Sequence, residues 1–197
     1  MPLGEAIFTQ RSIRRLRPAP IPGDDLRLIL EAASKAPSGG NSQPTRFLVL
    51  TNPGIIGPFG ALYREAWWAK RRDEGHHWTT RDVIPAEERS YRAAARLADE
   101  IAEAPCVVLA LGVRPGQATS VIPAVQNLLL AARALGIGTV PTTLHPQVLE
   151  RVHALLAIPA EAEIHLCIPL VSWLVSQSSA RSWHSRGKSA RKSRRMS

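Results

Sequence analysis

Three short strand-like segments rich in apolar residues, separated by longer amphipathic segments, are the feature that most limits what this chain can fold into. They cover residues 47–50, 106–113 and 163–170. The first two are continuous apolar runs without the apolar–polar alternation of a strand with one face in water, and the third is apolar from Leu166 to Leu170. We therefore expect strands that are buried on both faces. Apolar residues recur at helical spacing between the runs, so helices and strands interleave. This order predicts an α/β or α+β layered fold.

Five helices are expected around these strands. Asp24 or Asp25 can cap the first, and Pro37 ends it. Gly136 is expected to end the longest apolar helix, and the stretch that follows, as far as Thr143, is expected to be a loop. The other four expected helices cover residues 58–72, 86–103, 118–135 and 146–156.

The composition changes abruptly near Leu170. The chain has 197 residues and a formal net charge of +9, but residues 171–197 hold seven of those charges, nine serines and no proline. We therefore predict one domain over residues 1–170 and a basic tail over residues 171–197 that is disordered or held only by partner contacts. One hypothesis is that a frameshift produced this tail. A nucleic-acid-binding arm is the competing interpretation, although the segment lacks the pattern of a docking fold.

Several classes of protein are excluded by simple counts. The two cysteines, Cys106 and Cys167, are too few for a disulfide-rich scaffold or a four-cysteine zinc site, and both lie in apolar strands where a small core residue is expected. No apolar run reaches the roughly 18 residues of a membrane span. The first residues lack the apolar core of a signal peptide. These observations predict a soluble, cytoplasmic protein without a membrane partner.

Three polar segments beside apolar elements are candidates for a binding site. The first holds Arg11, Ser12 and Arg14. Guanidinium groups with a serine hydroxyl suit a phosphate, because arginine donates hydrogen bonds in a bidentate fork. A solvated basic arm is the alternative.

The second segment is the loop from Pro37 to Pro44, PSGGNSQP. Its adjacent glycines allow the backbone to approach a ligand closely. The side-chain amides of Asn41 and Gln43 can both donate and accept, which suits the C=O and N–H edges of a flat heterocycle. A plain surface loop is the alternative.

The third segment, GIGTVPTT, runs from Gly136 to Thr143. Small residues and paired threonine hydroxyls follow the end of a helix. The segment is not the GxGxxG that opens a helix after a strand, so a Rossmann dinucleotide site is rejected. A helix C-cap and turn are the alternative.

Together, the three segments resemble the nitroreductase family of flavoproteins in residue type, order and spacing, over about residues 1–170. APSGGNSQP is the most specific match, and Thr45 departs from it, since relatives usually carry an aromatic residue there. The resemblance implies an α+β layered fold with a central, mostly antiparallel sheet covered by helices. It also implies an intertwined homodimer with FMN at its interface.

The resemblance assigns roles to individual residues. Arg11, Ser12 and Arg14 would hold the phosphate and ribityl chain of FMN. The residues expected beside the isoalloxazine or the ribityl end are Ser38, Gly39, Asn41 and Gln43, with Pro141, Thr142 and Thr143 beside the flavin ring from the same or the partner chain. No protein side chain is assigned as catalytic, because N5 of the flavin carries the chemistry. No metal site is predicted.

The implied activity is hydride transfer from NAD(P)H, through FMN, to a small acceptor such as a nitroaromatic or a quinone. Flavin fragmentation and reductive dehalogenation are alternatives within the family. The stretch from Tyr63 to Tyr91 would cover the flavin and shape the substrate pocket, although Trp67 and Trp68 suit a dimer core equally well. Its acidic residues, Glu65, Asp73 and Glu74, are expected on a solvated helix face.

Overall fold

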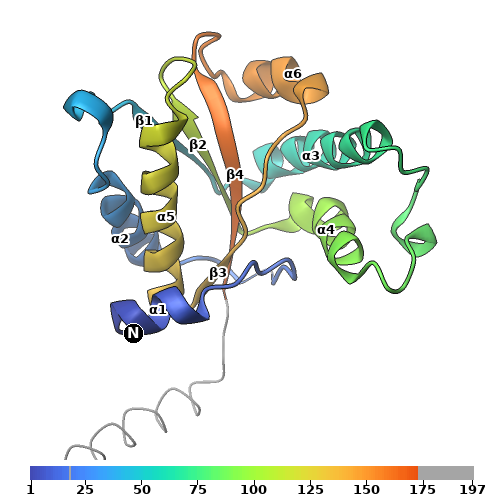
Figure 1. Ribbon diagram of the computed structural model, residues 1–197, viewed down its shortest axis with the longest axis horizontal. Helices are drawn as coiled ribbons and strands as arrows, with labels where there is room; N and C mark the ends of the chain where they lie inside the picture. The colour runs from blue at the N-terminus through green and yellow to red at the C-terminus, as the bar shows by residue number, and fades with distance from the viewer. Residues whose placement is uncertain (18, 173–197) are drawn as a thin grey trace, which may run out of the picture.

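A four-stranded antiparallel sheet forms the centre of the protein (Figure 1). The structure is a computed structural model that describes residues 1–17 and 19–172. In spatial order the strands are β1 (Thr45–Leu50), β2 (Cys106–Gly112), β4 (Glu163–Ser172) and β3 (Ile137–Thr139). Each neighbouring pair is antiparallel, so the predicted α+β fold with an antiparallel sheet is confirmed.

Strand β2 shows why both faces of the sheet are covered. All seven of its residues are buried. Cys106, Val108 and Ala110 belong to one apolar core, whereas Val107 and Leu109 belong to the other. Successive side chains of a strand point to opposite faces, so a continuous apolar run supplies both cores at once.

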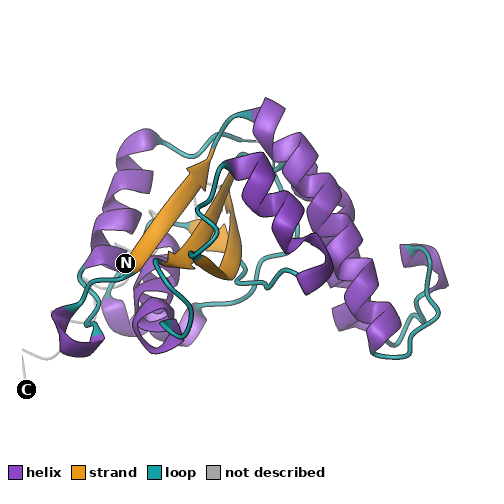
Figure 2. Ribbon diagram, turned by 90° about the horizontal axis from the view of Figure 1, so that it is seen from above, coloured by secondary structure: helices purple, strands orange, loops and turns teal. Residues whose placement is uncertain are grey.

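Helices cover the two faces of the sheet in separate groups (Figure 2). Helices α2 (Gly23–Ser34) and α5 (Ala118–Ala134) pack on one face, and the short α1 (Leu3–Thr9) contacts α5. The other face is covered by α3 (Pro53–Asp73), α4 (Arg89–Glu100) and α6 (Pro146–Leu156). Three short 3₁₀ helices lie at η1 (Gly39–Asn41), η2 (Arg81–Val83) and η3 (Ile101–Glu103).

Helix α3 passes very close to η3, and the sequence provides for this at Gly60. A Cβ atom on Gly60 would lie 2.6 Å from the Cα of Ala102, a distance that backbone atoms cannot tolerate. Glycine is therefore required at this crossing for α3 to settle on the sheet. The position of α3 matters because one face of this helix lines the candidate site described below.

Some local expectations differ from the structure. Helix α2 starts at Gly23, so neither Asp24 nor Asp25 is its N-cap. Both lie in its first turn, where their negative charges interact favourably with the positive end of the helix dipole. Ile137–Thr139 forms a strand rather than a loop, because it pairs with the end of β4. Helix α1 was not expected. The predicted tail lies outside the described residues, except that β4 continues to Ser172. None of the described helices is both long and apolar enough to span a membrane.

Candidate functional site

The basic segment near the N-terminus lies against strand β3. The N–H of Ile13 donates to the carbonyl of Thr139 at 2.9 Å, and Ser12 forms a bridge with Thr139. A Cβ atom on Gly138 would lie 2.9 Å from a side-chain atom of Val171 and 3.0 Å from Ile13. Because Gly138 has no side chain, residues 11–14, here called the arm, can pack onto the sheet.

The third polar segment is fixed just beyond β3. Thr142 and Cys167 exchange two backbone hydrogen bonds, at 2.9 and 2.8 Å, and the Thr142 hydroxyl donates to the Cys167 carbonyl at 3.0 Å. Pro141 and Thr143 flank this anchor and are exposed. The structure therefore brings the first and third predicted segments together.

A cavity of about 290 Å³, here called the arm cavity, lies where these segments meet. The arm contributes Arg14 to its wall. Arg11 does not line it, because this exposed side chain donates to the carbonyls of Gln10 and Phe8, at 2.6 and 3.3 Å. The polar and aromatic lining residues are Arg14, Tyr63, Trp67, Lys70, Arg71, Thr142, Thr143 and His145.

Helix α3 supplies a wall of the arm cavity, which was not predicted from the sequence. Tyr63, Trp67 and Arg71 recur at intervals of four, so they share one face of the helix. Burial raises the pKa of Tyr63 well above its ordinary value, which keeps the phenol neutral. The four-residue spacing was visible in the sequence and could have placed Arg71 on the apolar side of α3.

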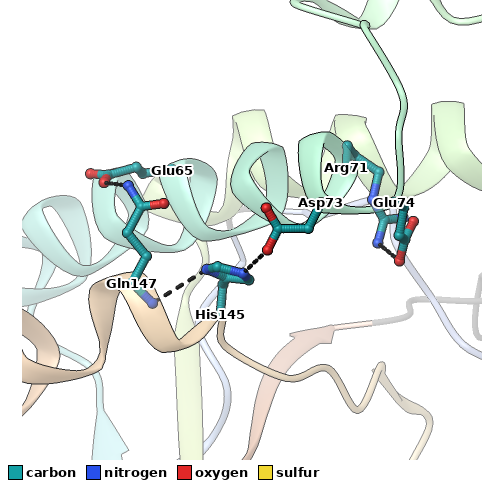
Figure 3. Close-up of polar contacts among 6 residues, drawn as sticks. All are labelled: Glu65, Arg71, Asp73, Glu74, His145 and Gln147. Carbon is teal, nitrogen blue, oxygen red and sulfur yellow. Dashed lines mark hydrogen bonds and ion pairs between the residues drawn. The ribbon is translucent and has the colours of Figure 1, made fainter.

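The acidic residues of this region reach solvent, as expected, since Asp73 and Glu74 are exposed and Glu65 is partly exposed, but they also bind neighbouring side chains. Nε2 of His145 lies 2.8 Å from a carboxylate oxygen of Asp73, and its Nδ1 accepts from the N–H of Gln147 at 3.3 Å. Glu65 accepts from the side chain of Gln147 at 3.0 Å and also pairs with Arg151. Figure 3 shows the contacts of Asp73 with His145 and of Glu65 with Gln147, which join α3 to the start of α6. They fix the segment that carries His145 against the end of α3.

The two cysteines are small core residues, as expected. Both thiols are fully buried, and burial raises the pKa of Cys106 and of Cys167 to about 12. A thiol with such a pKa stays protonated near neutral pH and is a poor nucleophile.

The glycine loop, residues 38–43, adopts an unusual backbone. Gly40, Asn41 and Gln43 have φ angles of 57°, 55° and 45°, in the left-handed region that favours glycine. Hydrogen bonds within the loop hold this conformation: Ser38 Oγ accepts from the N–H of Gln43 at 3.0 Å, and the Gln43 amide donates to Asn41 at 3.1 Å. Non-glycine residues persist in this region only where their surroundings fix them, often at functional sites.

Ser120, on the first turn of α5, anchors the glycine loop to the fold. Its hydroxyl accepts from the N–H of Gly39 at 3.1 Å, and its carbonyl accepts from the hydroxyl of Thr45 at 3.3 Å. A cavity of about 430 Å³, here called the loop cavity, has Ser38, Gln43 and Ser120 in its wall. Ser120 was not predicted as a site residue, since nothing local in the sequence connects position 120 with the loop.

The two groups of predicted residues do not meet within one chain. Thr45, next to the loop, pairs with Gly112 at one end of β2, whereas Thr139 pairs with Leu170, beside Cys106 at the other end. At about 3.4 Å per residue, the length of β2 separates these ends by about 20 Å. The loop cavity lies on the α2 and α5 face, and the arm cavity on the α3 and α4 face.

Comparison with known proteins identifies relatives over most of the chain. A sequence model described as the Nitroreductase family matches residues 7–170. An NADH dehydrogenase of Thermus thermophilus is 33% identical over 180 residues, covering 84% of this chain and 83% of the relative. An iodotyrosine deiodinase of Thermotoga neapolitana is 28% identical over 163 residues, covering 82% and 83%.

A solved structure shows the same fold. The crystal structure of an oxidized iodotyrosine deiodinase bound to FMN and 3-iodo-L-tyrosine superimposes with a TM-score of 0.69. The two sequences are 24% identical, and the match covers 86% of this chain and 89% of that one. The arrangement of sheet and helices described above is therefore shared.

Proposed function

Because the chain belongs to the nitroreductase family, we propose that it is an FMN-dependent oxidoreductase that passes hydride from NAD(P)H to a small acceptor such as a nitroaromatic or a quinone. The observation that carries the proposal is the arm cavity, where a guanidinium, threonine hydroxyls and an aromatic wall meet beside the packed arm. That combination suits a flat, polar-edged molecule that bears a phosphate.

The residues present fit FMN in their chemistry. Arg14, which lines the arm cavity, and the neighbouring Ser12 offer donors for a phosphate dianion, whereas Arg11 must leave its backbone carbonyls to take part. Asn41 and Gln43 offer amide groups that match the alternating C=O and N–H edge of the isoalloxazine. Hydrogen bonds within the loop hold its left-handed backbone in one conformation. The amides of Asn41 and Gln43 are therefore positioned before a ligand arrives.

The separation of the two groups supports a homodimer. Ligand pockets are usually about 300–1,000 Å³, and the cavities of 290 and 430 Å³ lie on opposite faces of the sheet. One FMN cannot contact both groups of one chain, because the sheet separates the two faces and the arm meets β3 about 20 Å along the strands from the glycine loop. In a two-fold dimer, the glycine loop of one chain meets the arm cavity of its partner, and two equivalent sites form.

In this proposal the chain binds and orients, and FMN supplies a reversible two-electron carrier when bound. Arg14 neutralises the phosphate, and Thr142, fixed to β4, presents a rigid edge beside the ring. Asn41 and Gln43 hold the heterocycle in register. Trp67 gives a flat apolar surface that limits water at the acceptor position.

The test is a titration of the purified full-length protein with FMN, followed by gel filtration. We expect a yellow dimer that retains one FMN per chain. Under anaerobic conditions NADH or NADPH should then remove the absorbance of the oxidised flavin, and nitrobenzene or a quinone should restore it. Failure to bind FMN at micromolar concentration would contradict the proposal, whichever nicotinamide is used.

Reductive dehalogenation is a second candidate, and the deiodinase relative favours it. In that reaction, two electrons and one proton replace a carbon–iodine bond by carbon–hydrogen, and iodide leaves. The aromatic wall formed by Tyr63 and Trp67 suits a halogenated phenol as well as a nitroaromatic ring.

Iodide release distinguishes the activities. The FMN-loaded protein, reduced with dithionite, is given 3-iodotyrosine or nitrobenzene in separate reactions. Dehalogenation releases one iodide for each two electrons consumed, whereas a nitroreductase reoxidises only with the nitro compound. Flavin fragmentation would consume FMN itself in air, and recovery of all the FMN after turnover excludes it.

A further inference from the structure

Arg71 is buried in the wall of the arm cavity, and the proposed function gives it no role. Its residue is only 8% exposed. Its guanidinium carbon lies 5.1 Å from the ring centre of Trp67 and 5.1 Å from that of Tyr91. A planar cation that contacts two aromatic rings is held in one orientation.

The hydrogen bonding of this guanidinium is incomplete. Nη2 donates to Glu74 at 2.8 Å (Figure 3), but the buried Nε finds no acceptor among the described residues. A buried N–H without an acceptor costs free energy, so an acceptor supplied by a ligand stabilises the site. Carboxylate oxygens bind arginine through short, charge-assisted hydrogen bonds.

The charge around the cavity also favours an anion. Lys70 and Arg14 line the wall together with Arg71, and none of the described lining residues is acidic. Glu74 offsets one positive charge through its pair with Arg71. The cavity wall therefore keeps a net positive charge, and such a charge raises the local concentration of anionic ligands.

We propose that Arg71 and Lys70 bind the acid group of an aromatic substrate, so that aromatic carboxylates are the preferred acceptors. This inference rests on the proposed function and names its substrate class. The phosphate of FMN is the other oxyanion that could reach the cavity. The aromatic lining favours the substrate, because Tyr63 and Trp67 suit a ring attached to the acid group, whereas a phosphate gains nothing from them.

Calorimetry with two ligands that cannot be reduced tests the binding directly. The FMN-loaded full-length protein is titrated with benzoate and with benzamide, which has nearly the same shape and no charge. We expect Arg71→Gln to weaken benzoate binding by roughly ten- to a hundredfold, as expected for a lost hydrogen bond between charged groups, and to leave benzamide unchanged. Arg72→Gln, on the exposed neighbouring position, is the matched control and should change neither.

A second variant, Glu74→Gln, is expected to change benzoate affinity in the opposite direction. Glu74→Gln removes the carboxylate that competes for Arg71, so benzoate should bind more tightly than to the parent protein. If Glu74→Gln weakens benzoate binding instead, the carboxylate positions Arg71 for a purpose other than anion binding, and the inference is wrong.

Turnover separates this inference from the function on which it rests. In the parent protein the KM for 4-nitrobenzoate should be lower than that for 4-nitrobenzamide, and Arg71→Gln should remove the difference. Equal KM values in the parent overturn the inference alone, while reduction of neither acceptor overturns the proposed function with it. A loss of FMN affinity in Arg71→Gln, with riboflavin affinity retained, would assign Arg71 to the phosphate and also overturn the inference.

Discussion

The glycine loop and the arm cavity are built in different ways. The loop is formed by consecutive residues whose left-handed backbone is held by their own side chains, and it offers neutral amides. The arm cavity is assembled from the N-terminus, α3 and the segment after β3, and it offers positive charge and aromatic rings. The first region recognises shape and polar edges, and the second recognises charge. Substitutions in the two regions should therefore affect different parts of a ligand.

The largest effect is expected from Gly138→Ala, which acts on the whole arm. Its Cβ atom would meet Ile13 and Val171 at 3.0 and 2.9 Å, so the arm or the end of β4 must move. Overpacking of this kind costs about 1–3 kcal/mol. The free energy of unfolding should fall by that amount in urea denaturation, and FMN affinity should fall further than in any single arm side-chain variant. Unchanged FMN affinity would show that the arm is not part of the site.

Arg14→Gln tests charge recognition by the arm. We expect FMN affinity to fall by about 1.5–3 kcal/mol, the usual worth of a hydrogen bond to a charged group, while riboflavin affinity stays the same. Fluorescence titration of both flavins measures the difference. Arg11→Gln is the control and should have a smaller effect, because Arg11 is exposed and bonded to backbone carbonyls. A similar loss of both flavins in Arg14→Gln would remove the phosphate role.

Asn41→Ala tests the loop by the opposite criterion. Loss of a hydrogen bond to a buried polar edge costs about 1–3 kcal/mol, or roughly ten- to a hundredfold in affinity. Because the amide should contact the heterocycle rather than the phosphate, FMN and riboflavin should weaken equally. Flavin titration that returns the parent dissociation constant would contradict this assignment.

Ser120→Ala should have the smallest effect. It removes the acceptor for the N–H of Gly39 and leaves the amides of Asn41 and Gln43 in place. An ordinary hydrogen bond contributes about 0.5–1.5 kcal/mol, so both flavins should bind a few-fold more weakly. Hydrogen exchange of the Gly39 amide should accelerate. If it does not, Ser120 does not anchor the loop.

The contrast between the regions also explains how far the sequence could predict the structure. The glycine loop depends on residues 37–44, so local turn chemistry was enough to find it. The apolar segments of β1, β2 and β4 likewise predicted strands buried on both faces, because that requirement acts on each strand separately. Strand β3 was missed, since its three residues become a strand only by pairing with the distant β4.

Arg71 shows why the arm cavity was predicted only in part. Among the charges of residues 64–74, an arginine suggests a solvated helix face, but its position four residues after Trp67 places it toward the core. Which charges are buried depends on Tyr91 of α4 and on Pro141 to His145, all distant in sequence. Periodicity gives the face of a helix, whereas tertiary packing decides what that face meets.

The most direct measurement asks whether one site takes its arm from one chain and its loop from the other. Chains carrying Arg14→Gln and Asn41→Ala, each with a different affinity tag, are co-expressed and the mixed dimer is purified. Such a dimer then contains one site without a substitution and one with both. We predict that each mixed dimer binds one FMN at the parent affinity. In a dimer of two identical variant chains, both sites should bind FMN more weakly than the parent. If both regions serve one chain's own site, every site in the mixed dimer carries one substitution, and the absence of any parent-affinity FMN would contradict the account.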